Sequence, residues 1–189
     1  MQAVPAEGDK IKLQSYLNPL LGLNENKDGE SMKSGKDYIG VGVGAIIIND
    51  EEKILLLKRK NSIDKSRTTI GMWSAPGGQV EFGEKTEDAA VRETKEEVGV
   101  DVEIVKPIGF TDQILKKSGL HWHLIYFLCK IKNGNPRIME PNNFEKIDWF
   151  SPKEIPDNVG LAHVIMPLYL LGLISKEEYQ KRLKNTPES

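Results

Sequence analysis

Hydrophobic and polar positions follow strand-like patterns along much of the chain from Tyr38 onward. Residues 41–48 are rich in Val and Ile and predict a strand that is buried on at least one face. The polar residues 49–52 separate this strand from a second apolar run at 54–57, and the pair predicts a hairpin. Three later segments also have strand patterns: residues 101–109, 120–131 and 146–150.

Helical patterns alternate with these strands. Residues 86–98 carry an apolar stripe, with Thr86 suited to the N-cap and Gly99 to the left-handed position after the last turn. Residues 161–173 predict an apolar helix that is interrupted near Pro167. Capping-box sequences predict two further helix starts, at residues 151–154 and 175–178. Strands interleaved with helices indicate a layered α/β domain.

The chain divides near Lys36. Residues 1–36 are polar apart from an apolar patch at 16–21, and we expect an N-terminal extension that is partly disordered or docked through this patch. Residues 37–160 would form the main domain, and residues 161–189 would form C-terminal helices packed on it or following it. A length of 189 residues is sufficient for one domain with an appendage.

Composition restricts the classes of partner. The net charge of −2 argues against a nucleic-acid polymer or an acidic membrane surface. Small anionic substrates remain open, because a bound cation can invert the local charge. The single cysteine, Cys129, excludes an internal disulfide and favours a reducing compartment. With no membrane-length apolar run and no secretory pattern at the N-terminus, we expect a cytoplasmic protein without a membrane partner.

The strongest candidate chemistry is a cluster of glutamates around Arg92. Glu93, Glu96 and Glu97 share one face of the predicted helix, and Glu84 lies just before it. Two carboxylates about 4 Å apart repel by roughly 4 kcal/mol at an effective dielectric near 20, a penalty that a divalent cation can remove. A solvated helix face is the alternative, although these glutamates adjoin the apolar stripe. The helix pattern alone leaves both interpretations open.

A longer pattern favours the cation site. The segment resembles the Nudix box of the Nudix hydrolases, and residues 71–78 are similar to the strand and turn that precede that box. Thr94 departs from the family pattern, which has an aliphatic residue at this position. The resemblance implies the α/β Nudix fold, a curved mixed β-sheet sandwiched between α-helices, over roughly residues 37–160. The identities are Gly78, Glu84, Arg92-Glu93, Glu96-Glu97, Gly99 and Val100.

The resemblance also implies the chemistry. It predicts a Mg²⁺-dependent hydrolase, with Mn²⁺ as an alternative ion, that cleaves a diphosphate linkage. The implied metal ligands are the carboxylates of Glu93, Glu96 and Glu97 and the carbonyl of Gly77. Arg92 is expected to hold Glu84 and a helix glutamate in place.

The implied general base is less defined. Relatives use either a glutamate of the box or one from a later loop, for which Glu140 and Glu145 are the candidates. We favour Glu145 because it lies shortly before Trp149, with a surface glutamate as the equally weighted alternative.

Substrate contacts are predicted at several positions. Arg59 suits a phosphate, although the cationic run 58–60 also fits solvated surface, and Gly78 would lie against the substrate. His121 and His123 share one face of a strand and Trp122 points to the other. A metal site on the two histidines is disfavoured, since no third ligand is suitably spaced. Base stacking on Trp122 or a hydrogen bond from a histidine competes with ordinary sheet packing, whereas Trp73 and Trp149 are expected in the core.

Several segments resemble the nucleoside-triphosphate branch of the family, which includes MutT-like enzymes. This resemblance implies a small nucleotide substrate cleaved to a nucleoside monophosphate and pyrophosphate, and a role in nucleotide-pool sanitation. The first alternative is an ADP-ribose or nucleotide-sugar pyrophosphatase, although residues 113–119 lack the proline or tyrosine typical of some such relatives. The second alternative is a non-catalytic ligand-sensing module. A homodimer is left open, because the apolar segment 166–173 suits an interface as well as a core.

Overall fold

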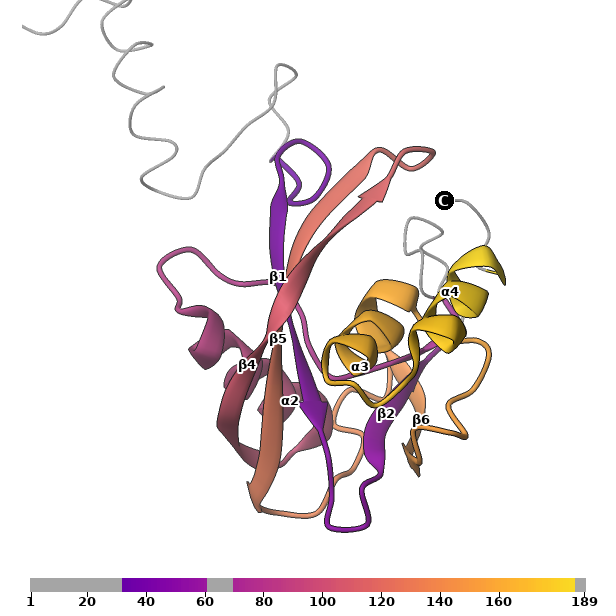
Figure 1. The fold of residues 1–189 in the computed structure, drawn as a ribbon. Coiled ribbons are helices and arrows are strands. Elements are labelled where there is room, and N and C mark those ends of the chain that lie inside the picture. Colours follow the sequence, from indigo (N-terminus) through magenta and orange to yellow (C-terminus); the bar gives the residue numbers. More distant parts are fainter. Residues whose placement is uncertain (1–31, 61–69, 186–189) are drawn as a thin grey trace, which may run out of the picture.

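The computed structural model describes residues 32–60 and 70–185, which form two three-stranded sheets with helices packed on both sides (Figure 1). This arrangement confirms the predicted α/β architecture, with its strands divided between two sheets. The first sheet has the order β1-β5-β4 and the second β3-β2-β6. The strands are β1 (Gly40–Ile47), β2 (Ile54–Arg59), β3 (Trp73–Ser74), β4 (Asp101–Leu115), β5 (Leu120–Asn133) and β6 (Phe144–Phe150).

The first sheet is mixed, since β1 runs parallel to β5 and β4 runs antiparallel to it. The predicted hairpin between β1 and β2 was wrong in extent, because only one bridge, Ile48 to Ile54, connects the two strands near their turn. Both edges of β1 are already bonded, to β5 on one side and to the segment 76–80 on the other. β2 therefore separates from β1 and pairs with β3 and β6.

The helices differ from the prediction mainly at their ends. α2 (Thr86–Val98) begins after Lys85 as N-cap, one residue before the predicted Thr86, and ends at Gly99 with φ of 75°. The helix predicted from residues 151–154 does not form. The Ser151 hydroxyl donates to the Glu154 carboxylate at 2.8 Å, which closes a turn instead of capping a backbone amide.

The C-terminal part confirms the other helical predictions. The interrupted apolar helix appears as a π-helix, η1 (Leu161–Ile165), followed directly by α3 (Met166–Leu170). α4 (Lys176–Asn185) follows Ser175, whose hydroxyl accepts a bond from the backbone N–H of Glu178. None of the helices in the described ranges has the length and apolar character needed to cross a membrane.

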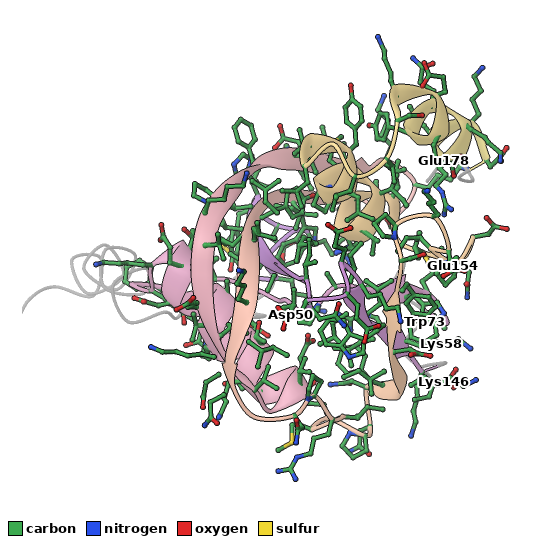
Figure 2. All side chains as sticks on the ribbon, turned by 60° about the horizontal axis from the view of Figure 1, so that its bottom comes forward. Asp50, Lys58, Trp73, Lys146, Glu154 and Glu178 are labelled. Atoms are coloured by element: carbon green, nitrogen blue, oxygen red, sulfur yellow. The ribbon has the colours of Figure 1, made fainter. Side chains whose placement is uncertain are left out.

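Two hydrophobic cores lie on opposite faces of β1 and β2. Ala45 and Leu55 pack with the buried face of α2, whereas Ile46 and Leu56 pack with η1 and α3. Alternating residues of the same strands therefore hold the helices of both layers. Trp73 belongs to the second core, as predicted, and its ring meets Phe150 edge-on. Charged side chains such as Lys146 and Glu154 lie outside these cores (Figure 2).

The described chain begins with a turn that packs against β5. The carbonyl of Gly35 accepts a 2.7 Å bond from the N–H of His121, and Ser34 forms a bridge with Tyr38. The domain boundary proposed at Lys36 falls inside this turn. The apolar patch at 16–21 lies outside the described residues.

Candidate active site

The segment 76–80, which precedes the glutamate cluster in the sequence, lies directly beside β1. The N–H of Val43 donates to the carbonyl of Gly78, and the N–H of Ala45 donates to that of Pro76, both at 2.8 Å. Gly77 lies between them with φ of 154°, and a Cβ there would overlap the carbonyl of Val43. Only glycine therefore fits this close approach of two backbones.

Glu97 connects α2 to this segment. The residue is 5% exposed, and its carboxylate accepts a 2.9 Å bond from the N–H of Gly77. The guanidinium of Arg59 lies 4.0 Å away, where it also stacks on the ring of Phe144. Burial raises the pKa of Glu97 to about 8, because these neighbours compensate only part of the lost hydration.

Arg92 organises the other carboxylates. Its guanidinium donates to both oxygens of Glu84, at 2.8 and 3.0 Å, and also to Glu93 and Glu96, at 2.8 and 3.0 Å. A further bond reaches the carbonyl of Gln79 at 3.0 Å and joins the helix to the segment 76–80. Arg92 lowers the pKa of Glu84 to about 2, whereas burial raises the pKa of Glu93.

The donor set suits a metal that needs few protein ligands. Within residues 32–60 and 70–185, no three acidic, histidine or cysteine side chains converge on one point. Instead, Glu93 and Glu96 point to Arg92, and Glu97 points to Gly77. Mg²⁺ is commonly bound through one or two carboxylates together with water and substrate phosphates. The buried and incompletely compensated carboxylate of Glu97 fits such an ion, because a cation would remove the penalty of its burial.

Of the two later glutamates, Glu140 is the one that interacts electrostatically with the box. Backbone N–H groups of Arg137 and Met139 donate to the carbonyls of Val98 and Glu97, each at 3.0 Å, which ties this loop to the end of α2. Burial is the main cause of the raised pKa of both Glu93 and Glu97, and the negative charge of Glu140 adds to it.

Glu145 has a different environment. This residue lies on β6, is exposed, and forms a 2.7 Å ion pair with Lys58 that lowers the pKa of its carboxyl group. The sequence favoured Glu145 for its place shortly before Trp149, and it could not show how the loop that carries Glu140 is tied to α2.

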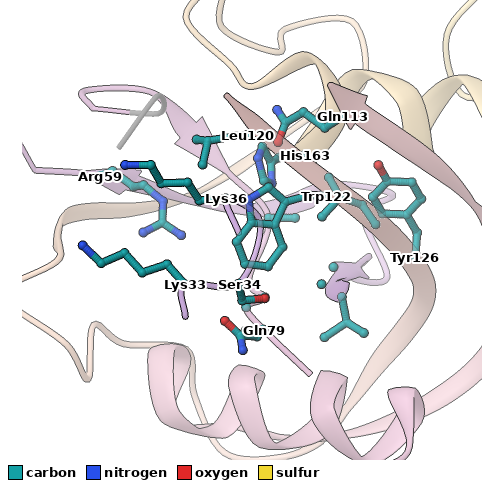
Figure 3. Close-up of a pocket in the computed structure, with 17 residues that line it drawn as sticks. Lys33, Ser34, Lys36, Arg59, Gln79, Gln113, Leu120, Trp122, Tyr126 and His163 are labelled. Carbon is teal, nitrogen blue, oxygen red and sulfur yellow. The ribbon is translucent and has the colours of Figure 1, made fainter. Parts of the chain in front are cut away.

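A pocket of about 510 Å³ opens beside Gly77 and Gly78. Figure 3 shows Trp122 near its centre, with Lys33, Lys36 and Arg59 on one side and Tyr126 on the other. The predicted contacts Arg59, Gly78 and Trp122 all line it. His121 and His123 do not line the pocket; His123 bonds to Asp112 at 2.8 Å, and His121 lies 4.0 Å from the same carboxylate.

Three glycines of β1 leave space for the side chains that line this pocket. Gly40, Gly42 and Gly44 lie opposite Trp122, Leu124 and Tyr126 in the register of β1 and β5. A Cβ on Gly40 would overlap the indole of Trp122, and one on Gly42 would crowd Leu124. The alternating glycines of the sequence GVGVGA were a usable signal for this surface, because residues i, i+2 and i+4 share one face of a strand.

Other lining residues were missed by sequence reasoning. Lys33 and Lys36 belong to the supposed extension, and Gln79 and His163 showed no pattern that marked them. Burial lowers the pKa of His163 to about 4, so its imidazole is neutral at pH 7. These residues come from distant parts of the chain, and only the fold brings them together.

A family model described as the NUDIX domain matches residues 39–168. The chain therefore belongs to the Nudix hydrolase family, as the resemblance of its box implied. The crystal structure of the MutT NUDIX hydrolase from Burkholderia pseudomallei superposes with a TM-score of 0.63 at 33% identity. That match covers 73% of this chain and 99% of the other.

Curated relatives carry different activities in their names. A putative 8-oxo-dGTP diphosphatase of Bacillus subtilis is 30% identical over 61% of this chain and 68% of its own length. An ADP-ribose pyrophosphatase of Methanocaldococcus jannaschii is 46% identical over 58% of this chain and 61% of its own length. The chain spans only 32% of a putative Nudix hydrolase 1 of Caenorhabditis elegans and 47% of Nudix hydrolase 2 of Arabidopsis thaliana.

Replacing Arg92 should destabilise the fold. Arg92→Ala removes the partner of Glu84, Glu93 and Glu96 at once, and we expect the free energy of unfolding to fall by about 1–3 kcal/mol. Urea denaturation followed by circular dichroism measures this change. Lys95→Ala is the matched control, since it removes an exposed ion pair on the same helix and should change stability by less than about 1 kcal/mol. Equal effects of the two variants would contradict the organising role of Arg92.

Proposed function

We propose that this protein is a divalent-cation-dependent hydrolase that cleaves the diphosphate linkage of a small nucleotide. One observation carries the proposal: the buried carboxylate of Glu97 contacts Gly77 and lies 4.0 Å from Arg59, and both of these residues line a pocket with a cationic side. This arrangement can hold a cation and a phosphate chain next to each other. Membership in the Nudix family supports the same chemistry.

Glu93 and Glu97, with the carbonyl of Gly77 and with Glu96 directly or through a water, are the residues that would hold Mg²⁺ or Mn²⁺. When bound, the ion would polarise phosphoryl oxygens and lower the pKa of a coordinated water. Arg92 would keep Glu84, Glu93 and Glu96 in position through the bonds described above. Arg59 would neutralise part of the charge on the phosphates.

Glu140 is our proposed general base. It acts electrostatically on Glu93 and Glu97, and its loop is tied to the end of α2 by two backbone bonds. In this role its carboxylate would accept a proton from the attacking water. Glu145 is less suited, because Lys58 holds its carboxylate and lowers its pKa.

A nucleoside triphosphate, cleaved to a monophosphate and pyrophosphate, is the leading substrate class. Three cations on one side of the pocket suit a polyanionic chain, and Trp122 offers a surface for a base. The similarity to a putative 8-oxo-dGTP diphosphatase supports this choice and a role in nucleotide-pool sanitation. ADP-ribose is the second candidate, favoured by the 46% identity to an ADP-ribose pyrophosphatase.

A substrate panel tests these alternatives. The purified protein with Mg²⁺ is incubated with dGTP, 8-oxo-dGTP, ATP and ADP-ribose, and the products are separated by ion-exchange chromatography. Triphosphates should yield monophosphate and pyrophosphate, whereas turnover of ADP-ribose to AMP and ribose 5-phosphate would establish the second candidate. Absence of any turnover, with Mn²⁺ as well, would favour the non-catalytic module.

Glu97→Gln tests the buried carboxylate. We expect turnover to fall at least ~100-fold, as for a lost positioned catalytic group, because the amide has no negative charge to offer a cation. The thermal midpoint should remain that of a folded domain. Glu87→Gln, an exposed site in the first turn of the same helix, is the control and should retain activity. Wild-type turnover in Glu97→Gln would refute its role as a ligand.

A pair of variants separates the two candidate bases. Glu140→Gln should lower kcat about 100-fold with little change in KM, while Glu145→Gln should remain within about threefold of the wild type. Steady-state kinetics on the preferred substrate of the panel provides both constants. The opposite order would restore Glu145 as the base, and two silent variants would point to a glutamate of the box.

A further inference from the structure

The turn formed by residues 33–38 is held in place as part of the pocket wall. The N–H of Lys33 donates to the carboxylate of Asp37 at 2.7 Å, and the N–H of Asp37 returns a 2.9 Å bond to the carbonyl of Lys33. The N–H of Gly35 donates to the carbonyl of Tyr38 at 2.9 Å, and the carbonyl of Gly35 accepts a bond from the N–H of His121 at 2.7 Å. The turn therefore has a defined conformation before any ligand binds.

Gly35 allows this turn to lie against Trp122. Its φ is 79°, and a Cβ at this position would overlap the indole ring. Gly40 of β1 meets the same indole, so Trp122 packs on two glycines and lines the pocket. Gly35 and Gly40 therefore allow the turn and β1 to lie close to Trp122.

The pocket has a charge pattern unlike that of the whole chain. The protein has a net charge of −2, yet among the described residues that line the pocket three are cationic and none is acidic. The cationic residues are Lys33, Lys36 and Arg59, and they lie on the same side of Trp122 (Figure 3). Such a wall is complementary to a chain of phosphates.

We infer that the 33–38 turn is a substrate-binding element whose two lysines select nucleotides with a longer phosphate chain. Arg59 lies 4.0 Å from Glu97 and is placed for the phosphates at the site of cleavage. Lys33 and Lys36 extend the cationic wall beyond Arg59, where they would contact further phosphates. This inference rests on the proposed function for its substrate class, but it concerns binding and can be measured without turnover.

Equilibrium binding of dGTP and dGMP in EDTA tests the inference. Affinities are measured by isothermal titration calorimetry at low salt. The EDTA removes divalent metal ions, which excludes both hydrolysis and a contribution of the metal to binding. We expect the wild type to bind dGTP more tightly than dGMP, and Lys33→Ala/Lys36→Ala to weaken dGTP binding about tenfold. The same variant should lose less than about threefold in affinity for dGMP, in keeping with partly exposed charge contacts.

The matched control is Lys130→Ala/Lys132→Ala, which removes the same charge from exposed positions of β5 outside the pocket and should leave both affinities unchanged. Gly35→Ala should reproduce the loss of dGTP affinity with both lysines present, because it displaces the turn from Trp122. Combined with the lysine substitutions, it should add little further loss.

Unchanged dGTP affinity in Lys33→Ala/Lys36→Ala would overturn the inference, as would equal losses for dGTP and dGMP or no binding of dGTP by the wild type. The proposed function has a separate criterion, which is product formation in the substrate panel. Selective loss of dGTP binding in a protein that hydrolyses no nucleotide would therefore refute the proposed function and leave this inference standing.

Discussion

The contact between the carboxylate of Glu97 and the backbone of Gly77 is the constraint on which the rest of the site depends. It joins the last turn of α2 to a segment that is itself bonded along β1, at the cost of burying a carboxylate with incomplete compensation. A charge so placed would be a liability in an inert core, where apolar residues of similar volume are often at least as stable. Beside Gly77 and Arg59, which line the pocket, it is a suitable place for a cation. A cation bound there would favour the ionised form of a carboxyl group whose pKa burial raises to about 8.

The carboxylates of the box and the cations that line the pocket come from different elements, and the two sets meet where Arg59 lies 4.0 Å from Glu97. The carboxylates lie on α2 and its preceding loop, where Arg92 restrains their orientation. The lysines and Arg59 come from other elements and line the pocket. Gly77 and Gly78 also line the pocket. They allow the backbone to lie close to the carboxylates, since a side chain on Gly78 would overlap the carboxylate of Glu93. A phosphate chain with its metal ion has complementary charge to both sides.

Relatives of this chain are named for different substrates. Proteins named for 8-oxo-dGTP and for ADP-ribose both resemble it, and both matches extend over more than half of the chain. In the proposed function, the glutamate helix would act on the diphosphate linkage, which both ligands contain. Under the same proposal, discrimination between them would come from Trp122, the 33–38 turn and the neighbouring polar residues that line the pocket.

The sequence by itself determined the box helix, its glycine end and the α/β class, because helix periodicity, capping and the spacing of charged residues are local properties. It also indicated Arg59 and Trp122 as candidates. Only the tertiary structure decided that β1 pairs with β5 instead of β2, that the charge of Glu140 acts on Glu97, and that lysines before the domain line its pocket. The physical reason is that these relations join residues far apart along the chain. Such pairings depend on which backbone edges remain unbonded, and no local pattern encodes that.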